Sequence, residues 1–295
     1  MKNKGAEMRR HARTLLETGK VRISSLATIT MIAGYVLARG EVTWPLAAVT
    51  VGVFLVAFGS SGLNQIQERD VDAVMERTCG RPLPSRRSSL TYAVAVSVLC
   101  LVSGALVVLA GSNVAAMGLA LAAAAWYNGV YTPLKRVTAF AAVPGGVVGA
   151  IPPVIGWVAG GGWALDARIL AVAFFFFMWQ VPHFWLFLLS SCGEDYEKAG
   201  LPSMTRMFSL EQISRITLMW IIGTAAACLM IPLFGVIDEP WVNVGFLAAG
   251  VWIVWRSVRI LHASRGDTGF QHAFKRINQY ACIVVSLLSL AGLLR

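Results

Sequence analysis

Residues 49–82 read VTVGVFLVAFGSSGLNQIQERDVDAVMERTCGRP, and this stretch decides the fold. It begins with an uncharged apolar run, Val49 to Phe58, and then places four carboxylates and three arginines within fourteen residues, 68–81. Asn64, Glu68 and Asp72 are four residues apart, and on a helix four residues advance about 400°, so the three side chains share one stripe. Gly80 and Pro82 are typical of a helix end, which predicts that the helix bearing this row ends near Cys79.

The composition is that of a polytopic membrane protein. Of the 295 residues, 57% are hydrophobic and only 14% are charged, and the mean hydropathy is +0.66. A soluble domain carries about a quarter charged residues. The apolar runs are too long and too uniform for the alternating strands of a membrane barrel. The five cysteines form no CxxC pair, which argues against a disulfide framework or a zinc site.

The apolar runs predict an all-α fold with nine transmembrane helices. A basic cytoplasmic segment, 1–21, precedes a single nine-helix domain, 22–295; the segment lacks the early apolar region of a signal peptide. The predicted spans are 22–39, 45–66, 90–110, 113–131, 138–158, 166–190, 212–234, 240–256 and 277–294.

The charges predict the orientation. With nine spans, the N-terminus and the links 67–89, 132–137, 191–211 and 257–276 lie on one side, together with all basic residues except Arg39, Arg168 and Arg295. This asymmetry identifies the cytoplasmic side, places the C-terminus opposite, and explains the net charge of +10 without a nucleic-acid partner. We therefore expect a bacterial-type inner membrane protein surrounded by the lipid bilayer.

The row at 64, 68 and 72 offers hard oxygen donors, the kind that Mg²⁺ chelated by a diphosphate prefers. Arg77 and Arg81 could hold the phosphate oxygens. Asn64 lies at membrane depth, where a polar side chain is costly unless it faces a cavity or a partner. The charges could alternatively pair among themselves in a solvated loop.

Three further groups lie on the same side or near it. Glu194 and Asp195 follow the sixth span and could complete a metal site or form a solvated loop. Tyr131, Lys135, Arg136, Lys20 and Arg22 could clamp a diphosphate, or could be interface and topology residues. His183 follows Pro182 inside the membrane, where it could be a hydrogen-bonded core residue or a haem ligand.

Several blocks in order along the chain resemble the intramembrane aromatic prenyltransferase superfamily, and most of all its protohaem IX farnesyltransferase (haem O synthase) branch. The blocks are Lys20-Val21-Arg22-Ile23, the Asn64 to Pro82 stretch, Tyr131-Thr132-Pro133-Leu134-Lys135-Arg136, Gly149 to Trp157, Pro182-His183-Phe184 and Asp195 to Pro202. The second cluster departs from the superfamily pattern, because Lys198 stands where a second acid would follow Glu194.

The resemblance implies a central cavity open to the cytoplasmic side, farnesyl diphosphate and protohaem IX as substrates, and Mg²⁺ as cofactor. It implies that Asn64, Glu68 and Asp72 bind the metal–diphosphate, with Lys135 and the arginines neutralising the leaving group. Lys198 joins the expected diphosphate contacts, Glu194 and Asp195 the expected metal ligands, and His183 is the expected haem contact. A downstream haem O-oxidising enzyme is a further candidate partner.

Two other functions remain open from the sequence. One is prenyl transfer to a quinone precursor such as 4-hydroxybenzoate, which the shared Asn-acid-acid spacing permits. The other is a membrane transporter, whose broken helices at the midplane are suggested only by Pro182 and Pro152-Pro153. The gathering of acids at one end of the helices favours the enzyme.

Overall fold

A computed structural model describes residues 13–191, 193–237, 239–262 and 268–294, so most of the predicted basic segment, 1–12, lies outside the described residues. Within these ranges the chain has no strand, and nine helical segments are long and apolar enough to cross a membrane. Their main helices are α2 (Val21–Arg39), α3 (Trp44–Gln67), α5 (Leu90–Gly111), α6 (Val114–Trp126), α8 (Ala142–Ala159), α9 (Ala167–Ser191), α12 (Leu210–Leu233), α13 (Pro240–Ser257) and α14 (Gly269–Leu293). With the short elements next to them, the fourth, fifth and eighth spans run Val114–Leu134, Ala139–Ala159 and Pro240–Leu261. Short elements extend or link them: α4 (Arg69–Val74), η1 (Tyr127–Tyr131), α7 (Thr132–Leu134), η2 (Ala139–Ala141), α10 (Gly193–Lys198), α11 (Met204–Met207) and η3 (Val258–His262).

The predicted helices are confirmed, and one boundary differs substantially. The last helix begins at Gly269, two turns before the predicted residue 277. Its first turns carry Lys275 and Arg276, whose charges lower the hydropathy without preventing a helix. The Arg276 guanidinium donates to the backbone carbonyl of Arg256 at 2.9 Å, which fastens this polar beginning to the end of α13.

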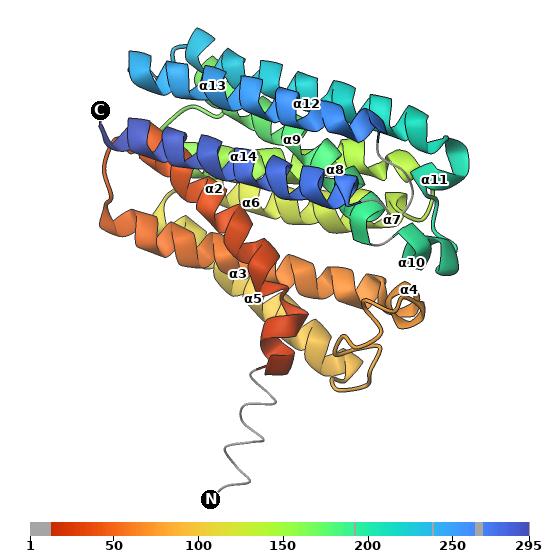
Figure 1. Ribbon diagram of the computed structural model, residues 1–295. Coiled ribbons are helices and arrows are strands. Elements are labelled where there is room, and N and C mark those ends of the chain that lie inside the picture. The colour runs from red at the N-terminus through yellow and green to blue at the C-terminus, as the bar shows by residue number, and fades with distance from the viewer. Residues whose placement is uncertain (1–12, 192, 238, 263–267, 295) are drawn as a thin grey trace, which may run out of the picture.

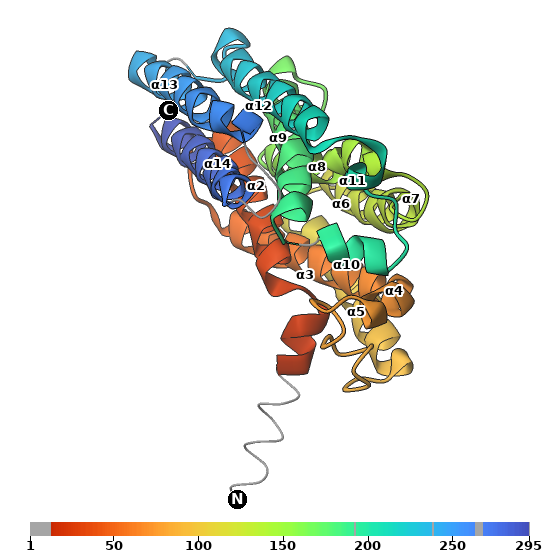
Figure 2. The ribbon, with the colours of Figure 1, turned by 45° about the vertical axis from the view of Figure 1, so that its right-hand side comes forward.

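The helices form two outer groups around a middle one. In Figures 1 and 2, α3 and α5 lie on one side, α12 and α13 on the other, and α2, α6, α8 and α9 between them. The tightest contact joins α2 to α8: a Cβ on Gly34 would overlap the Pro153 carbonyl, and one on Gly156 would overlap that of Met31. Such close approach is the usual role of small residues in membrane helices, which have no hydrophobic effect to hold them together.

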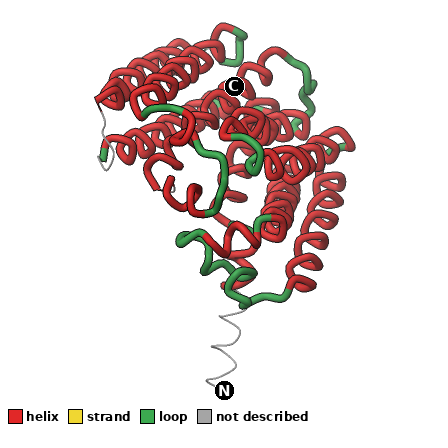
Figure 3. The backbone as a smooth tube through the Cα atoms, turned by 90° about the vertical axis from the view of Figure 1, so that its right-hand side faces the viewer, coloured by secondary structure: helices red, strands yellow, loops and turns green. Residues whose placement is uncertain are grey.

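The short helices gather at one end of the bundle. In Figure 1, α4, α7, α10 and α11 lie at the right-hand end, and the C-terminus lies at the left-hand end. Figure 3 views the molecule from the right-hand side of Figure 1, where loops and short helices lie across the ends of the long helices. The two segments that carry the acidic clusters therefore share one face of the protein.

Candidate active site

The row of oxygen donors spans a helix break. The sequence predicted one helix to near Cys79, but α3 ends at Gln67, Glu68 has φ −99° and ψ 6°, and α4 ends at Val74. That prediction was wrong: the residues after Val74 form turns, and these turns contact other parts of the protein instead of continuing the helix. The row itself survives, since the amide of Glu68 donates to the Asn64 carbonyl (3.0 Å) and that of Asp72 donates to the Glu68 carbonyl (2.7 Å).

Each oxygen-bearing side chain of the row is paired with a basic side chain. Lys20 Nζ donates to Asn64 Oδ1, and Lys135 Nζ pairs with the Glu68 carboxylate. Arg81 Nη1 lies 2.8 and 2.6 Å from the two oxygens of Asp72. The three cations come from three separate segments: the start of α2, the turn after α7, and the turns after α4. Three donors and three cations are thus paired at this end of the bundle.

Asn64 is fully buried, and its orientation is fixed by Thr132, a residue that the sequence pattern did not single out. The Asn64 Nδ2 donates to Thr132 Oγ1 at 2.9 Å, and that hydroxyl donates to the Tyr127 carbonyl at 2.8 Å. The amide oxygen is therefore directed at Lys20. A signal was available, because Thr132 and Asn128 are polar residues that interrupt the apolar fourth span; Asn128 donates to Ser60 Oγ at 2.7 Å.

Burial and neighbouring charge perturb the titration of the site. Burial, reinforced by the nearby Arg81, lowers the pKa of Lys20 to about 7. Burial alone would raise the pKa of Glu68, but Lys135 and Lys20 outweigh it and hold that pKa below its ordinary value. Because Lys20 is only partly protonated near pH 7 and Glu68 stays ionised, this end of the site can accept further negative charge by completing the protonation of Lys20.

Tyr131 joins the site through Lys135. It ends the π-helical turn η1, its ring stacks on Tyr127 at 5.7 Å between centroids, and Lys135 Nζ lies 5.0 Å from its centroid. A Cβ at Gly145 would overlap this ring, so a glycine is needed there. Isolated π turns inside α-helices often occur at functional sites.

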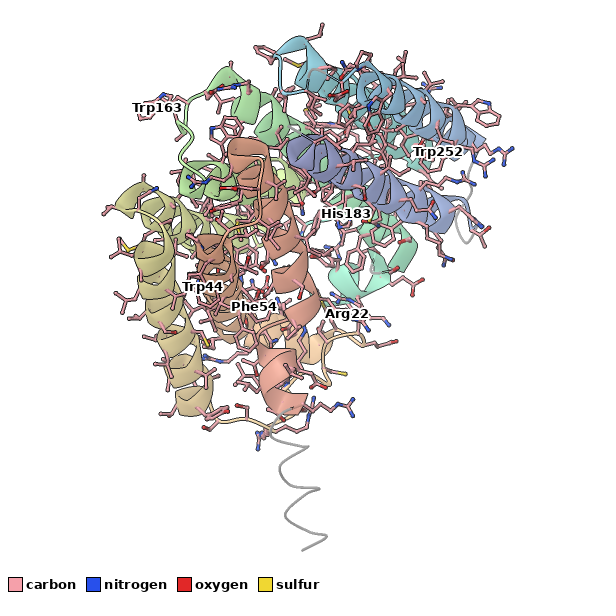
Figure 4. The ribbon with its side chains drawn as sticks, turned by 90° about the vertical axis from the view of Figure 1, so that its left-hand side faces the viewer. Arg22, Trp44, Phe54, Trp163, His183 and Trp252 are labelled. Atoms are coloured by element: carbon pink, nitrogen blue, oxygen red, sulfur yellow. The ribbon has the colours of Figure 1, made fainter. Side chains whose placement is uncertain are left out.

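The other predicted site residues are not brought into the row. Arg136 binds both oxygens of Asp70 (2.9 and 2.7 Å), Lys198 pairs with Glu76 (2.6 Å), and both ion pairs are exposed. Arg22 and Glu194 are exposed, the former on the side of the molecule shown in Figure 4.

Asp195 has a different partner from the one expected. Its carboxylate accepts the backbone amides of Glu76 and Arg77, both at 3.2 Å, and so ties α10 to the turn after α4. Within the described ranges, no three His, Cys, Asp or Glu side chains come together as a metal site. The two acidic clusters therefore meet through a backbone contact.

His183 lies in α9 among aromatic rings. Its ring centroid is 4.6 Å from that of Trp179 and 5.2 Å from that of Phe274 on α14. Among the residues that the structure describes, its buried Nδ1 has no hydrogen-bond partner, a property that it shares with Trp185 Nε1 on the same helix.

An apolar cavity of about 570 Å³, counting its open mouth, lies between α2, α3, α6 and α8. Most of this volume is open to its surroundings, and the space that a water-sized sphere can occupy is about 90 Å³, smaller than the range of about 300–1,000 Å³ for typical small-molecule sites. Ser60, Ser61 and Tyr127 line it one turn from Asn64, whereas Val53, Ala120 and Ile155 line its far end. The eleven residues from Asn64 to Val53 correspond to about 16 Å along α3.

The donor set suits magnesium together with a diphosphate. Mg²⁺ is usually held by one or two carboxylates plus substrate phosphates, rather than by a complete protein cage. Glu68, Asp72 and the amide oxygen of Asn64 supply such a partial set, which is consistent with the lack of a three-carboxylate cluster among the residues described. Their partners Lys20, Lys135 and Arg81 are the cations that a diphosphate would attract.

Comparison with known proteins supports the fold and the chemistry. The model of the UbiA prenyltransferase family matches residues 27–278. The chain is 42% identical over 224 residues to "Protoheme IX farnesyltransferase" of Geobacter sulfurreducens, covering 75% of this chain and 82% of the relative. It is 35% identical over 232 residues to the protein of the same name from Oleidesulfovibrio alaskensis, covering 79% and 82%.

Solved structures show the same fold at low identity. A digeranylgeranylglyceryl phosphate synthase has a TM-score of 0.78 and 16% identity, with 96% of this chain and 99% of that chain covered. A UbiA homologue from Archaeoglobus fulgidus, bound to DMAPP and Mg²⁺, has a TM-score of 0.71 and 14% identity, with 95% and 99% covered. On the family match and these relatives, the chain is a polytopic membrane protein that belongs to the UbiA prenyltransferase family.

Proposed function

We propose that this protein transfers the farnesyl group of farnesyl diphosphate to the 2-vinyl group of protohaem IX, with addition of water, to give haem O and diphosphate. The observation that carries the chemistry is the set of three oxygen donors paired with three cations, one turn from an apolar cavity. The choice of acceptor rests on the two relatives named for protohaem IX.

The cations bind and stabilise the leaving group. Lys20, Lys135 and Arg81 converge from separate segments on one small region, where a diphosphate would receive charge-assisted hydrogen bonds. As the bond between the farnesyl carbon and the diphosphate oxygen breaks, negative charge grows on the diphosphate, and fixed cations stabilise it most in that state. Tyr131 is the neighbour that orients Lys135.

The row would hold Mg²⁺. Asn64, Glu68 and Asp72 are the residues assigned to it, and bound Mg²⁺ would supply further charge to polarise the phosphate oxygens. Glu194 and Asp195 are less suited, since the former is exposed and the latter accepts two backbone amides. Three cations that were also predicted from the sequence are less suited: Arg136 and Lys198 are paired with Asp70 and Glu76, and Arg22 is exposed.

The electron balance of the transfer is that of an alkylation. The leaving diphosphate takes both electrons of the carbon–oxygen bond, and the terminal vinyl carbon of the haem forms the new bond to the farnesyl carbon. The cation left on the inner vinyl carbon then takes up water and releases a proton. The apolar cavity protects the first cation from water, and its aliphatic walls suit an isoprenoid chain.

His183 is our candidate for contact with the haem. Its unpartnered Nδ1 and the rings of Trp179 and Phe274 offer a polar atom and flat surfaces for a macrocycle. We also propose that the site lies on the cytoplasmic side of the inner membrane, as the charge distribution predicts. A haem O-oxidising enzyme that takes up the apolar product is the corresponding partner.

The decisive experiment is product analysis with purified protein in detergent. Haem and farnesyl diphosphate are supplied with and without Mg²⁺, and products are resolved by mass. The expected result is haem O and released diphosphate only when both substrates and Mg²⁺ are present. Failure to convert haem under conditions where the protein remains folded would refute the proposal.

Two rivals are tested alongside. Replacing haem by 4-hydroxybenzoate tests prenylation of a quinone precursor, which the shared row of donors also permits. A transporter predicts substrate uptake into vesicles without diphosphate release. The pairing of every oxygen ligand in the row with a cation favours an enzyme that stabilises a diphosphate leaving group over a transporter. The two relatives favour haem over the benzoate as the acceptor.

A further inference from the structure

The contact between α9 and α14 contains a ladder of rings that the diphosphate site does not use. Trp179, His183 and Phe187 lie on one stripe of α9, spaced four residues apart, and Phe274 of α14 lies against the last two. Arg77 completes the ladder at its polar end. Neighbouring ring centroids are 4.6 Å apart for Trp179 and His183, 5.2 Å for His183 and Phe274, and 5.7 Å for Phe274 and Phe187, and Arg77 Cζ is 5.3 Å from the Phe187 centroid.

The ladder differs from the packed core. Its four rings are only partly buried, whereas Phe175, Phe176 and Trp185 on the same helix are at most 2% exposed. Partly open aromatic faces are what a flat, largely apolar ligand requires.

Arg77 is held over the ladder and kept away from the donor row. Its backbone amide and that of Glu76 donate to Asp195, which fixes the turn against α10. Its guanidinium lies within the range of a cation–π contact with Phe187. Across the described part of the chain, no carboxylate lies within ion-pair distance of it, whereas Arg81 Nη1 contacts both oxygens of Asp72.

We propose that Arg77 binds a propionate of the haem acceptor, with the ladder as the surface on which the macrocycle rests. This inference rests on the proposed function and deepens it. The propionates and the vinyl groups occupy opposite halves of a protohaem. Anchoring the anionic half at Arg77 directs the vinyl half away from the charged side chains, toward the apolar part of the bundle.

The dimensions allow this arrangement. From Phe187 to Trp179 the ladder extends about 12 Å along α9, which is long enough to support a macrocycle below a side chain at the rim. An arginine suits this position because its planar guanidinium binds a carboxylate through two parallel hydrogen bonds and remains charged at any pH of interest. Asp195 is then a positioning residue for Arg77, which explains an acid where the sequence predicted a metal ligand.

The test compares two porphyrins that differ only in the propionates. Purified protein is titrated with protohaem IX and with its dimethyl ester, and binding is followed by the Soret absorbance without farnesyl diphosphate. We expect Arg77→Gln to weaken binding of the free acid about three- to tenfold, the range between an exposed and a half-buried ion pair. The ester should bind wild type and variant equally.

Matched variants separate this role from structure and from the diphosphate. Arg77→Lys should keep most of the affinity, and Arg86→Gln, an exposed arginine in the same loop, should leave it unchanged. Asp195→Asn should weaken the free acid but not the ester. The KM for farnesyl diphosphate should stay the same in Arg77→Gln.

The outcomes that overturn the inference are distinct. If Arg77→Gln weakens acid and ester alike, the residue is structural. If it raises the KM for farnesyl diphosphate and leaves haem binding unchanged, Arg77 is a diphosphate clamp. If the folded wild-type protein binds neither porphyrin, the proposed function fails and the inference fails with it.

Discussion

Arg81 Nη1 contacts both carboxylate oxygens of Asp72, at 2.8 and 2.6 Å, although nine residues and a helix end separate the two in the chain. Asp72 is 3% exposed, so this carboxylate is balanced by the arginine rather than by water. Buried charges are stable only when paired. The contact fixes the positions of both Asp72 carboxylate oxygens in the substrate-free protein.

Removing the charge of Asp72 should strongly reduce turnover. Asp72→Asn keeps the side-chain shape but leaves Arg81 without its partner and removes a proposed metal ligand. We expect a fall in kcat of about 10²- to 10³-fold, the usual cost of losing one group that stabilises a developing charge. Haem O formation in membranes, normalised to folded protein, measures it.

Asp70→Asn is the matched control. Asp70 is two residues away but exposed, and it pairs with Arg136 outside the row. Exposed ion pairs contribute at most about 1 kcal/mol, so this variant should retain most of its activity. Equal losses in the two variants would contradict the assignment of the row.

Lys20 should make substrate binding depend on pH. Its pKa of about 7 lies below the 10.5 of an unfolded lysine, so above pH 7 it is mostly neutral and must take up a proton to bind diphosphate. We expect the KM for farnesyl diphosphate to rise between about pH 7 and 9, by up to about tenfold per pH unit. In Lys20→Arg, which stays charged, that part of the slope should disappear.

The same shift has an opposite sign for stability. Between pH 7 and 10.5 the unfolded chain binds more protons at Lys20 than the folded chain does, so the free energy of unfolding rises with pH through this group.

Parallel KM profiles for the wild type and Lys20→Arg would show that the lysine does not titrate as inferred. Other titrating groups, including the diphosphate itself, affect both proteins equally.

Ala120 should set the length of the isoprenoid. It is 1% exposed and lines the far end of the cavity with Val53 and Ile155. Ala120→Leu should lower kcat/KM for farnesyl relative to geranyl diphosphate about tenfold or more, since each excluded methylene loses about 0.8 kcal/mol of burial. Competition between the two diphosphates, with products resolved by mass, gives the ratio.

Ala122→Leu controls for the added side chain. Ala122 lies on the same helix but on its exposed face, so its substitution should leave the ratio unchanged. If Ala120→Leu also leaves it unchanged, the isoprenoid lies elsewhere.

Gly34 should be essential for the contact between α2 and α8. A Cβ there would overlap the backbone of Pro153, which cannot move aside as a flexible side chain can. Gly34→Ala should destabilise the protein by about 1–3 kcal/mol, the usual range for overpacking. Thermal unfolding in detergent, followed by circular dichroism, measures the shift in the midpoint.

Gly118→Ala is the comparison for that effect. Gly118 lies in α6, and no atom of a neighbouring helix lies within 4 Å of the position that a Cβ would occupy there. An alanine at this position should therefore be neutral or stabilising by up to about 1 kcal/mol. If the two alanine variants had the same midpoint, the close approach of α2 and α8 would not limit stability.

The sequence alone predicted the nine spans found among the described residues and the end of the bundle where the two acidic clusters lie. Apolar runs of about 20 residues can satisfy their backbone in lipid only as helices, so hydropathy predicts them without knowledge of their neighbours. The row at 64, 68 and 72 was likewise predicted, because helical periodicity is local. The break at Glu68 was not, since a single residue's φ and ψ depend on what Asp72 and its neighbours contact afterwards.

Only the tertiary structure decided the partners. Three features depend on contacts between residues more than forty positions apart. They are the pairing of each cation with an oxygen of the row, the orientation of Asn64 by Thr132, and the contact of Asp195 with the turn at Arg77. A sequence does not show which of several arginines faces a given ligand, and Arg77, Arg81 and Arg136 were all predicted to bind the diphosphate. Packing separates them, because each guanidinium goes to the nearest group that compensates its charge: a ring of Phe187, the carboxylate of Asp72, or the carboxylate of Asp70.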